Sequence, residues 1–232
     1  MKLNKRLLVL SEMVTKPYQL VWDCCCDHGL LGIKILSDGL VKQVNFVDLV
    51  PEIITNLDNK LSRFGHKLPV DCQWQTFCQD VALLSLDNTL EKSHADTKEL
   101  VIISGVGGEL MLSMLSRLME PYSGKNIDFL LCPVNHTYQL REGLIKLNFK
   151  LIEERLVTDN DRSYELLLIN QTAQQPLSLL GECLWVNESE SQLYLQKLIE
   201  HYQRRESDQT STDCVNHAVL TAYQNLYQSR YA

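Results

Sequence analysis

The sequence is poor in glycine, with ten glycines in 232 residues, and it lacks both common phosphate-binding fingerprints. Neither G-x-G-x-x-G nor G-x-x-x-x-G-K-[ST] follows its first apolar run, so a site for a pyrophosphate group is disfavoured. Long apolar runs are absent too, and none approaches the roughly 18 residues of a membrane-spanning helix. The basic start precedes only a short apolar run, which does not suit a secretory signal. We therefore expect a cytoplasmic protein that does not enter a membrane.

Positive charge is scarce, because 22 Lys and Arg face 29 Asp and Glu, which gives a net charge of −7. Proteins that coat a polyanion need clustered cations, so this composition disfavours general nucleic-acid binding. Local basic groups still provide candidate phosphate contacts, with ordinary solvated surface as the alternative for each. The candidates are Lys5 and Arg6, the group Lys60, Arg63, His66 and Lys67, and the pair Arg204 and Arg205.

The eight cysteines include no C-x-x-C pair. Cys24, Cys25 and Cys26 are consecutive, and neighbouring side chains on a strand point to opposite faces, so the three do not converge on one metal ion. We expect no metal site, and reduced thiols that act as small apolar side chains. A cysteine nucleophile with His28 as its base is a minor alternative.

Strand-like and helix-like apolar patterns alternate through the first 146 residues. Strands are expected at 20–25, 44–48, 70–77, 100–104 and 127–132. Helices are expected at 4–14, 29–37, 51–63, 108–119 and 137–146. Strands that alternate with helices indicate an α/β fold with a parallel sheet.

The pattern changes after residue 148. Two strand-like runs at 149–157 and 163–170, joined by the polar segment 158–162, predict an antiparallel hairpin at one edge of the sheet. With the five earlier strands they make seven, the usual number in a Rossmann-like methyltransferase sheet.

The last sixty residues predict a separate helical unit. The polar segment 171–176 suggests a linker, and apolar residues recur at helical spacing over 188–205 and 214–229. Neither helix can bury its apolar stripe alone, so we expect an antiparallel helical hairpin. The predicted domains are 1–172 and 173–232.

The strongest functional signal lies at the ends of the first two strands. The first strand ends at Asp23 and turns through small residues into a helix, and the second ends at Asp48. An acidic residue at the second strand's tip is typical of half-domains that bind an adenosine-bearing cofactor, because it accepts both ribose hydroxyl protons. We count its neighbour Leu49 among the cofactor contacts. S-adenosylmethionine is the expected cofactor, since it carries ribose, adenine and a sulfonium cation but no phosphate.

Two other features near these strands have two interpretations each. Asp23 either fixes the turn through backbone amides or approaches the amino-acid part of the cofactor. Gly105, Gly107 and Gly108 lie between a buried strand and a helix. They are either a plain turn or a gap that leaves open space beside the cofactor.

Five short motifs, in order along the chain, resemble those of one family. They are Leu3-Asn-Lys-Arg-Leu7 (family L-S-K-R-L), Asp23-Cys-Cys-Cys-Asp27-His28 (D-I-G-S-D-H), Ser104-Gly-Val-Gly-Gly108 (A-G-M-G-G), Leu131-Cys-Pro133 followed by Arg141 (L-Q-P…L-R) and Ser163-Tyr-Glu165 (F-Y-E). Each is weak alone, but together the chain resembles the bacterial tRNA adenine-22 N1-methyltransferases, which join a Rossmann-like domain to a C-terminal helical coiled coil.

The chain departs from this family at three positions. Cys25 stands where the family has a glycine that lets the backbone approach the cofactor's methionine part, so a shifted cofactor or a different backbone conformation is required. The third strand ends in Gln79-Asp80-Val81 instead of G-D-G, and the resemblance places Asp80 beside the adenine amine. The family's asparagine after the fifth-strand proline is Val134 here, with Asn135 one position later.

The resemblance implies methyl transfer from S-adenosylmethionine to N1 of an adenine in tRNA. That nitrogen carries an in-plane lone pair, so the enzyme mainly positions the two reactants. Asp27 is the candidate carboxylate near the base, and His28 is its neighbour or an ordinary surface residue. The candidate contacts to the flipped base are Asn135, His136 or Tyr138. A methyltransferase with a small-molecule or protein substrate and a non-catalytic RNA- or partner-binding relative remain as alternatives. We expect a monomer or a weak dimer.

Overall fold

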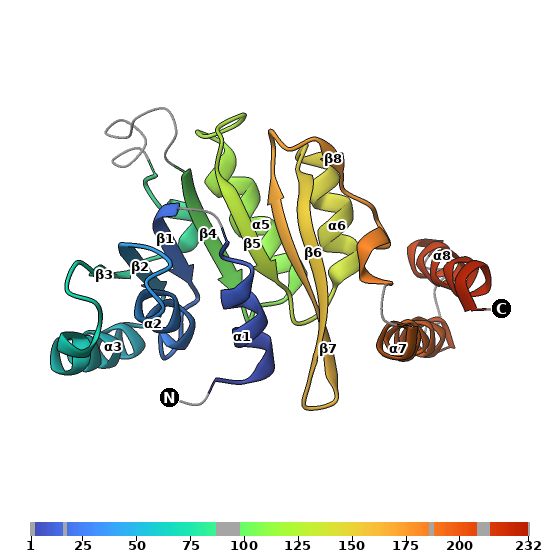
Figure 1. The fold of residues 1–232 in the computed structure, drawn as a ribbon. Helices are drawn as coiled ribbons and strands as arrows, with labels where there is room; N and C mark the ends of the chain where they lie inside the picture. The colour runs from blue at the N-terminus through green and yellow to red at the C-terminus, as the bar shows by residue number, and fades with distance from the viewer. Residues whose placement is uncertain (1–2, 16–17, 87–97, 186–187, 208–213, 232) are drawn as a thin grey trace.

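An eight-stranded sheet runs through the molecule in the order β3-β2-β1-β4-β5-β7-β6-β8 (Figure 1). The structure is a computed structural model that describes residues 3–15, 18–86, 98–185, 188–207 and 214–231. The strands are β1 (Tyr18–Cys24), β2 (Gln43–Asp48), β3 (Gln73–Cys78), β4 (Lys98–Ser104), β5 (Asp128–Cys132), β6 (Lys150–Asp159), β7 (Arg162–Asn170) and β8 (Gln175–Pro176). Strands β1 to β5 pair in parallel, and β7 pairs antiparallel with β5 and β6. The expected Rossmann-like α/β sheet is confirmed.

Helices cover both faces of the sheet because its central strands are apolar on both sides. Along β1, Trp22 and Cys24 enter one core and Val21 enters the other. Figure 1 shows α1 on one face of the sheet and α5 and α6 on the other. The helices are α1 (Lys5–Glu12), α2 (Leu30–Ser37), α3 (Pro51–Phe64), α5 (Gly108–Met119), α6 (Thr137–Lys146), α7 (Glu188–Ser207) and α8 (Cys214–Tyr231).

Local sequence signals set several of these boundaries. Asn4 caps α1, because its side-chain oxygen accepts a hydrogen bond from the Leu7 amide at 2.9 Å. Pro51 lies in the first turn of α3, where its missing amide hydrogen leaves no bond unmade. Both Asn160 and Asp161 have positive φ, 48° and 63°, so β6 and β7 continue up to a two-residue turn. The expected five-residue connection at 158–162 is therefore too long.

The segment expected to be a linker pairs with the sheet instead. Gln175 and Pro176 form β8 against Leu151 and Lys150 of β6, which makes the eighth strand. Leu177 follows and is buried in the core beneath α5 and α6. Sequence analysis missed this pairing because a two-residue strand is too short to show an alternating pattern.

The C-terminal helices α7 and α8 lie side by side at the β6 end of the sheet, as the apolar spacing predicted (Figure 1). Their shared core contains Leu195, Tyr202 and Tyr223, and it extends to Tyr138 of α6 and Leu156 of β6. Aromatic side chains therefore provide much of the contact between the helical pair and the sheet.

A buried polar network sits beneath this contact. The Arg141 guanidinium donates from Nε to Glu165 and from Nη2 to Glu154, both at 2.7 Å, and from Nη1 to the Ser178 carbonyl at 2.9 Å. Tyr194 of α7 donates its hydroxyl to the other oxygen of Glu165 at 2.7 Å. Burial opposes the charge on Arg141, but Glu165 and Glu154 raise its pKa above the ordinary value. The network joins α6, β6, β7 and α7.

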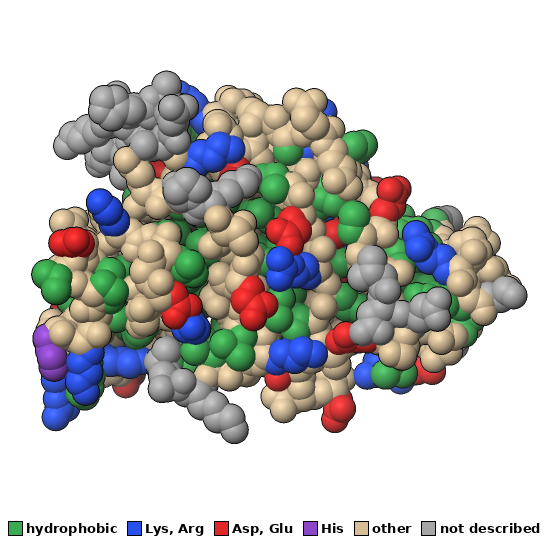
Figure 2. Space-filling view, in the orientation of Figure 1, with side chains coloured by type: hydrophobic (Ala, Val, Ile, Leu, Met, Phe, Trp, Pro, Cys, Tyr) green, Lys and Arg blue, Asp and Glu red, His purple; other side chains and the backbone are tan. Residues whose placement is uncertain are grey.

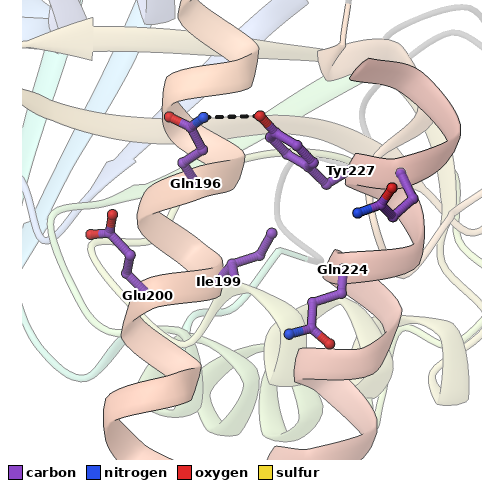
Figure 3. A pocket seen from close by; sticks show the side chains of 6 residues that line it. Gln196, Ile199, Glu200, Gln224 and Tyr227 are labelled. Carbon is purple, nitrogen blue, oxygen red and sulfur yellow. Dashed lines mark hydrogen bonds between the residues drawn. The ribbon is translucent and has the colours of Figure 1, made fainter. Parts of the chain in front are cut away.

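A hollow of about 480 Å³ lies between α7 and α8 (Figure 3). Gln196 on one helix donates a hydrogen bond to the Tyr227 hydroxyl on the other at 3.0 Å, and Ile199 and Gln224 also line the hollow. No candidate site residue lines it. Within the described ranges, no helix combines the length and apolar character needed to cross a membrane.

Candidate functional site

Strands β1 to β5 are parallel, so they end at the same side of the sheet, which we name the carboxyl edge. In open α/β sheets, ligands bind in the crevice outside these strand ends. All predicted site residues lie at or directly after them. They are Asp23, Cys25, Asp27 and His28 at β1, Asp48 and Leu49 at β2, Asp80 at β3, Gly105 and Gly107 at β4, and Asn135 at β5.

The turn after β1 has a left-handed backbone at three residues. The φ angles are 55° at Cys25, 49° at Asp27 and 66° at Gly29. The Cys26 amide ties the turn to β2 by donating to the Val47 carbonyl at 3.1 Å. Cys25 therefore retains a backbone conformation that suits glycine, at a cost of about 1–2 kcal/mol.

Asp48 joins the loops that follow β1 and β2. Its Oδ2 accepts a hydrogen bond from the Asp27 amide at 3.2 Å, and its Oδ1 accepts one from the Val50 amide at 3.1 Å. Each carboxylate oxygen can accept more than one bond, so the half-buried side chain keeps acceptor capacity for a ligand. The exposed side chain of Leu49 follows at the same edge.

Asp23 is buried and faces the first turn of α2. Its Oδ2 accepts a hydrogen bond from the Gly32 amide at 2.9 Å. Burial raises the pKa of this carboxyl to about 7, a rise that the Gly32 amide opposes and the Asp48 carboxylate adds to. Of the two interpretations, this contact matches the one in which Asp23 fixes the turn through a backbone amide.

Because the folded state binds the Asp23 proton more tightly than the unfolded chain does, this group stabilises the fold at low pH. That contribution is complete below about pH 4 and is lost as the pH rises to about 7. In the wild type, loss of the Asp23 proton lowers the free energy of unfolding between pH 5 and pH 8.5. Asp23→Asn keeps the acceptor for Gly32 but cannot lose a proton, so we expect this decrease to be smaller in the variant by on the order of 1–3 kcal/mol. Urea unfolding at pH 5 and at pH 8.5 measures the free energy of unfolding. The exposed Asp71→Asn is the control, and an equal fall in the Asp23 variant and the wild type contradicts the prediction.

Asp80 is held by backbone and by charge. It caps the short helix η2 (Val81–Leu83) by accepting from the Ala82 amide at 2.9 Å. Its other oxygen lies 3.5 Å from the guanidinium of Arg117 on α5. The carboxylate is thus fixed at the end of β3, where the resemblance places it beside an adenine amine.

The glycine turn after β4 packs against the loop after β5. The Gly108 amide donates to the Asn135 carbonyl at 3.0 Å, and the Val134 amide donates to the Val106 carbonyl at 3.0 Å. A Cβ atom at Gly107 would lie 2.6 Å from Oδ1 of Asn135. Gly107 therefore lets Asn135 occupy its observed place.

Gly105 has a different reason to be glycine. Its φ of 85° is one that other residues rarely adopt, and among the described residues no atom beyond its chain neighbours lies within 4 Å of a Cβ built there. The backbone is therefore open to a ligand at the end of β4, which agrees with the predicted gap.

Asp27 and His28 project from the turn after β1. Their side chains are largely exposed, and His28 Nε2 lies 3.8 Å from an oxygen of Asp27. Lys60 of α3 donates from Nζ to the His28 carbonyl at 3.1 Å, which ties this turn to the end of α3. The pair thus lies exposed at the carboxyl edge, in a position that we name the mouth of the edge.

The carboxylates concentrate negative charge around Cys25. Burial, together with the smaller effects of the Asp48, Asp23 and Asp80 carboxylates, raises the pKa of its thiol to about 12. The thiol is therefore protonated at neutral pH and unsuited as a nucleophile. The same field favours a cationic ligand.

A comparison of the sequence with models of known families gives one match. A family model described as a methyltransferase domain matches residues 3–167. The chain belongs to this methyltransferase family. No curated protein sequence matches it.

Solved structures share the fold of this methyltransferase over nearly its whole length, the helical pair included. The B. subtilis m1A22 tRNA methyltransferase TrmK is 19% identical, with a TM-score of 0.71, and the match covers 98% of this chain and 96% of TrmK. M. capricolum TrmK in complex with S-adenosyl-homocysteine is 16% identical, with a TM-score of 0.73 and coverage of 99% and 98%. Streptococcus pneumoniae Sp1610 in complex with S-adenosyl-L-methionine is 19% identical, with a TM-score of 0.72 and coverage of 97% and 99%.

Several residues of the methyltransferase edge escaped the sequence analysis. Arg117 pairs with Asp80, and Glu109 lies 3.1 Å from the imidazole of His136. Exposed apolar side chains border the same edge, among them Leu83, Leu110 and Val134. Their spacing offers no signal, because the short helix η2, helix α5 and the loop after β5 are separate along the chain and only the parallel sheet brings them together.

Two of the three consecutive cysteines enter different cores of the methyltransferase. Cys24 packs beneath α5 and α6, and Cys26 packs beneath α2 and α3. In the part of the chain that the structure describes, no three His, Cys, Asp or Glu side chains are arranged to hold a metal ion.

Proposed function

We propose that this methyltransferase takes its methyl group from S-adenosylmethionine and transfers it to N1 of an adenine in tRNA, at position 22. The likeness over both full chains to TrmK proteins, one of them bound to S-adenosyl-homocysteine, supports the substrate and the cofactor. The observation that carries the proposal is the pair of carboxylates at the carboxyl edge: Asp48 at the end of β2, bonded to the Asp27 amide of the turn after β1, and Asp80 just after the end of β3.

The residues of this edge fit the cofactor. Asp48 keeps acceptor capacity for two ribose hydroxyls, and Asp80 lies at the neighbouring strand end for an adenine amine. Gly105, at the end of β4 on the other side of β1, leaves room for the amino-acid part of the cofactor. The negative field suits a sulfonium and an α-amino group, and it disfavours a pyrophosphate.

Asp48→Ala is expected to weaken binding of S-adenosyl-homocysteine at least about tenfold. The change removes charge-assisted hydrogen bonds worth on the order of 1.5–3 kcal/mol. Isothermal titration calorimetry measures the dissociation constant. Asp38→Ala, which removes an acid paired with Lys34 away from the edge, is the control and should bind as the wild type does. Unchanged affinity of Asp48→Ala contradicts the assignment.

The adenine N1 lone pair attacks an activated methyl group in line, so no strong base is needed before the attack. When bound, the cofactor would supply that methyl on a sulfonium, whose sulfur keeps the electron pair of the broken S–CH3 bond and leaves as a neutral thioether. The chain itself supplies position and charge. Asn135, seated over Gly107, offers an amide to the Watson–Crick edge of the base. The Asp27 carboxylate at the mouth, beside His28, stabilises the positive charge that the methylated base acquires.

The substrate base must be unpaired or flipped, because N1 lies on its pairing edge. Candidate phosphate contacts lie on α1, next to β6. Arg6 stacks over the ring of Tyr164 with 5.0 Å between its guanidinium carbon and the ring centre, and its charge acts on Cys132 at the end of β5. These cations border the carboxyl edge.

Transfer of a radiolabelled methyl group to unmodified tRNA tests the proposal. We expect labelling of tRNA that carries an adenine at position 22 and loss of labelling when that base is replaced, with 1-methyladenosine identified by mass spectrometry of the digested product. Cofactor binding without labelling of tRNA points to a small-molecule or protein substrate. Absence of both points to a non-catalytic relative.

A further inference from the structure

A groove with an apolar floor and a cationic rim lies between α2 and α3. Its volume is about 560 Å³. The lining residues with apolar side chains are Leu30, Ile33, Leu61, Phe64 and Leu68, and Lys60 and Lys67 contribute cations. No feature of the proposed chemistry at the carboxyl edge uses it.

Phe64 is the centre of the cationic side. Its side chain is 47% exposed at the end of α3. The Arg63 guanidinium carbon lies 5.5 Å and the Lys67 Nζ 5.3 Å from the centre of its ring. Gly65 holds the chain close to Trp74, since a Cβ there would lie 2.3 Å from the Trp74 ring.

The charge here has one sign. Among the described residues, no acidic side chain lies within ion-pair distance of Lys60, Arg63 or Lys67. Figure 2 shows Lys, Arg and His side chains gathered over α3. In a chain of net charge −7, this concentration of cations calls for an anionic partner.

The groove is continuous with the mouth of the carboxyl edge. Lys60, one of its lining residues, donates to the carbonyl of His28 at 3.1 Å. Leu30, another lining residue, begins α2 directly after the turn that carries Asp27 and His28. The groove therefore meets the mouth at Leu30 and Lys60. Phe64 lies one helical turn beyond Lys60, where Gly65 packs on Trp74 near the start of β3.

We propose that the groove binds an unpaired nucleotide of the tRNA substrate, with its base against Phe64 and neighbouring phosphates on Lys60, Arg63 and Lys67. The inference rests on the proposed function, because a tRNA whose target base is exposed brings unpaired neighbours to this surface. Aromatic rings beside cations are the usual platform for single-stranded nucleic acid, since every base can stack and every nucleotide carries a phosphate. The groove thus supplies a second RNA contact, separate from the methyl-transfer chemistry.

Fluorescence anisotropy of a labelled tRNA transcript tests this groove on the full-length protein. We expect Phe64→Ala and Phe64→Leu to weaken binding about tenfold and Phe64→Trp to restore it, because stacking needs an aromatic face. Lys60→Ala/Lys67→Ala should reduce the log–log salt slope by roughly two, about one for each phosphate that is no longer neutralised. Binding of S-adenosyl-homocysteine should stay at the wild-type value in all of them.

Two matched variants serve as controls. Leu193→Ala removes an exposed apolar side chain from α7, and Lys125→Ala/Lys150→Ala removes two exposed cations from the opposite side of the sheet. Both should bind tRNA as the wild type does.

The outcomes separate the groove from the proposed function. If the wild type methylates tRNA and every groove variant binds tRNA equally well, the groove serves another occupant, such as an acidic protein segment, and this inference is overturned alone. If Phe64→Leu retains full affinity, the stacking contact is overturned. If the wild type neither binds nor methylates tRNA, the proposed function fails together with the groove.

Discussion

Gly107→Leu is expected to abolish methyl transfer while the protein stays folded. Gly107 has φ −70° and ψ 152°, a conformation that any residue adopts, so the substitution brings no backbone strain. The new side chain instead meets Asn135, whose Oδ1 would lie 2.6 Å from its Cβ, and fills the space where we place the base and the methyl group. The measurements are circular dichroism, binding of S-adenosyl-homocysteine and turnover with tRNA.

A smaller substitution isolates the part that Asn135 contributes. In Gly107→Ala the added Cβ displaces only the Asn135 side chain. If this displacement is what lowers the kcat/KM of Gly107→Ala, then Asn135→Ala should lower kcat/KM by a similar factor. The double variant Gly107→Ala/Asn135→Ala should then have the same kcat/KM as either single variant. Additive losses would show that position 107 acts on substrate independently of Asn135. A folded Gly107→Leu protein with normal turnover contradicts the assignment of the site.

Arg141→Leu is expected to lower the free energy of unfolding by about 3–5 kcal/mol. The guanidinium is almost fully buried and pairs with two buried carboxylates, Glu154 and Glu165, which the substitution leaves without a counter-charge. For a chain of this length, such a loss corresponds to a fall in Tm on the order of 10 °C. Urea unfolding and thermal melting measure it.

A surface pair provides the matched control. Arg155 also contacts two carboxylates, those of Glu153 and Glu12, but its side chain is 37% exposed. Arg155→Leu should therefore cost no more than about 1 kcal/mol. Near-identical melting of the Arg141 and Arg155 variants contradicts the importance of burial in this network.

The network also accounts for two of the motif residues that carry the family resemblance. Arg141 and Glu165 lie beneath the contact with α7, where Tyr194 donates to Glu165. Tyr194→Phe should loosen α7 from the sheet and alter the near-ultraviolet circular dichroism of Trp185, whose ring stacks on that of Tyr194. These two motif residues therefore stabilise the packing of α7 and α8 against the sheet.

Sequence alone predicted the elements that depend on local signals. Apolar periodicity placed five parallel strands, their helices, the β6–β7 hairpin and the C-terminal pair, because the spacing of apolar residues follows directly from helix and strand geometry. It also placed the site residues at strand ends, since the carboxyl ends of parallel strands share one side of a sheet. Their roles toward cofactor and substrate stay predictions.

Tertiary structure decided what those residues touch. The pairing of β8 with β6 and the seat of Asn135 over Gly107 depend on partners 24 or more residues away in the sequence. The two-residue turn at Asn160 and Asp161 and the contact of Asp23 with Gly32 are local, but they became visible only once the strands were paired and Asp23 was buried. The groove at Phe64 depends likewise on α2 meeting α3. The local pattern of apolar residues predicts which face of a helix or strand is buried. Which elements contact one another depends on how the whole sheet assembles. The charge, the pKa values and the open space at the site are therefore determined only in the folded chain.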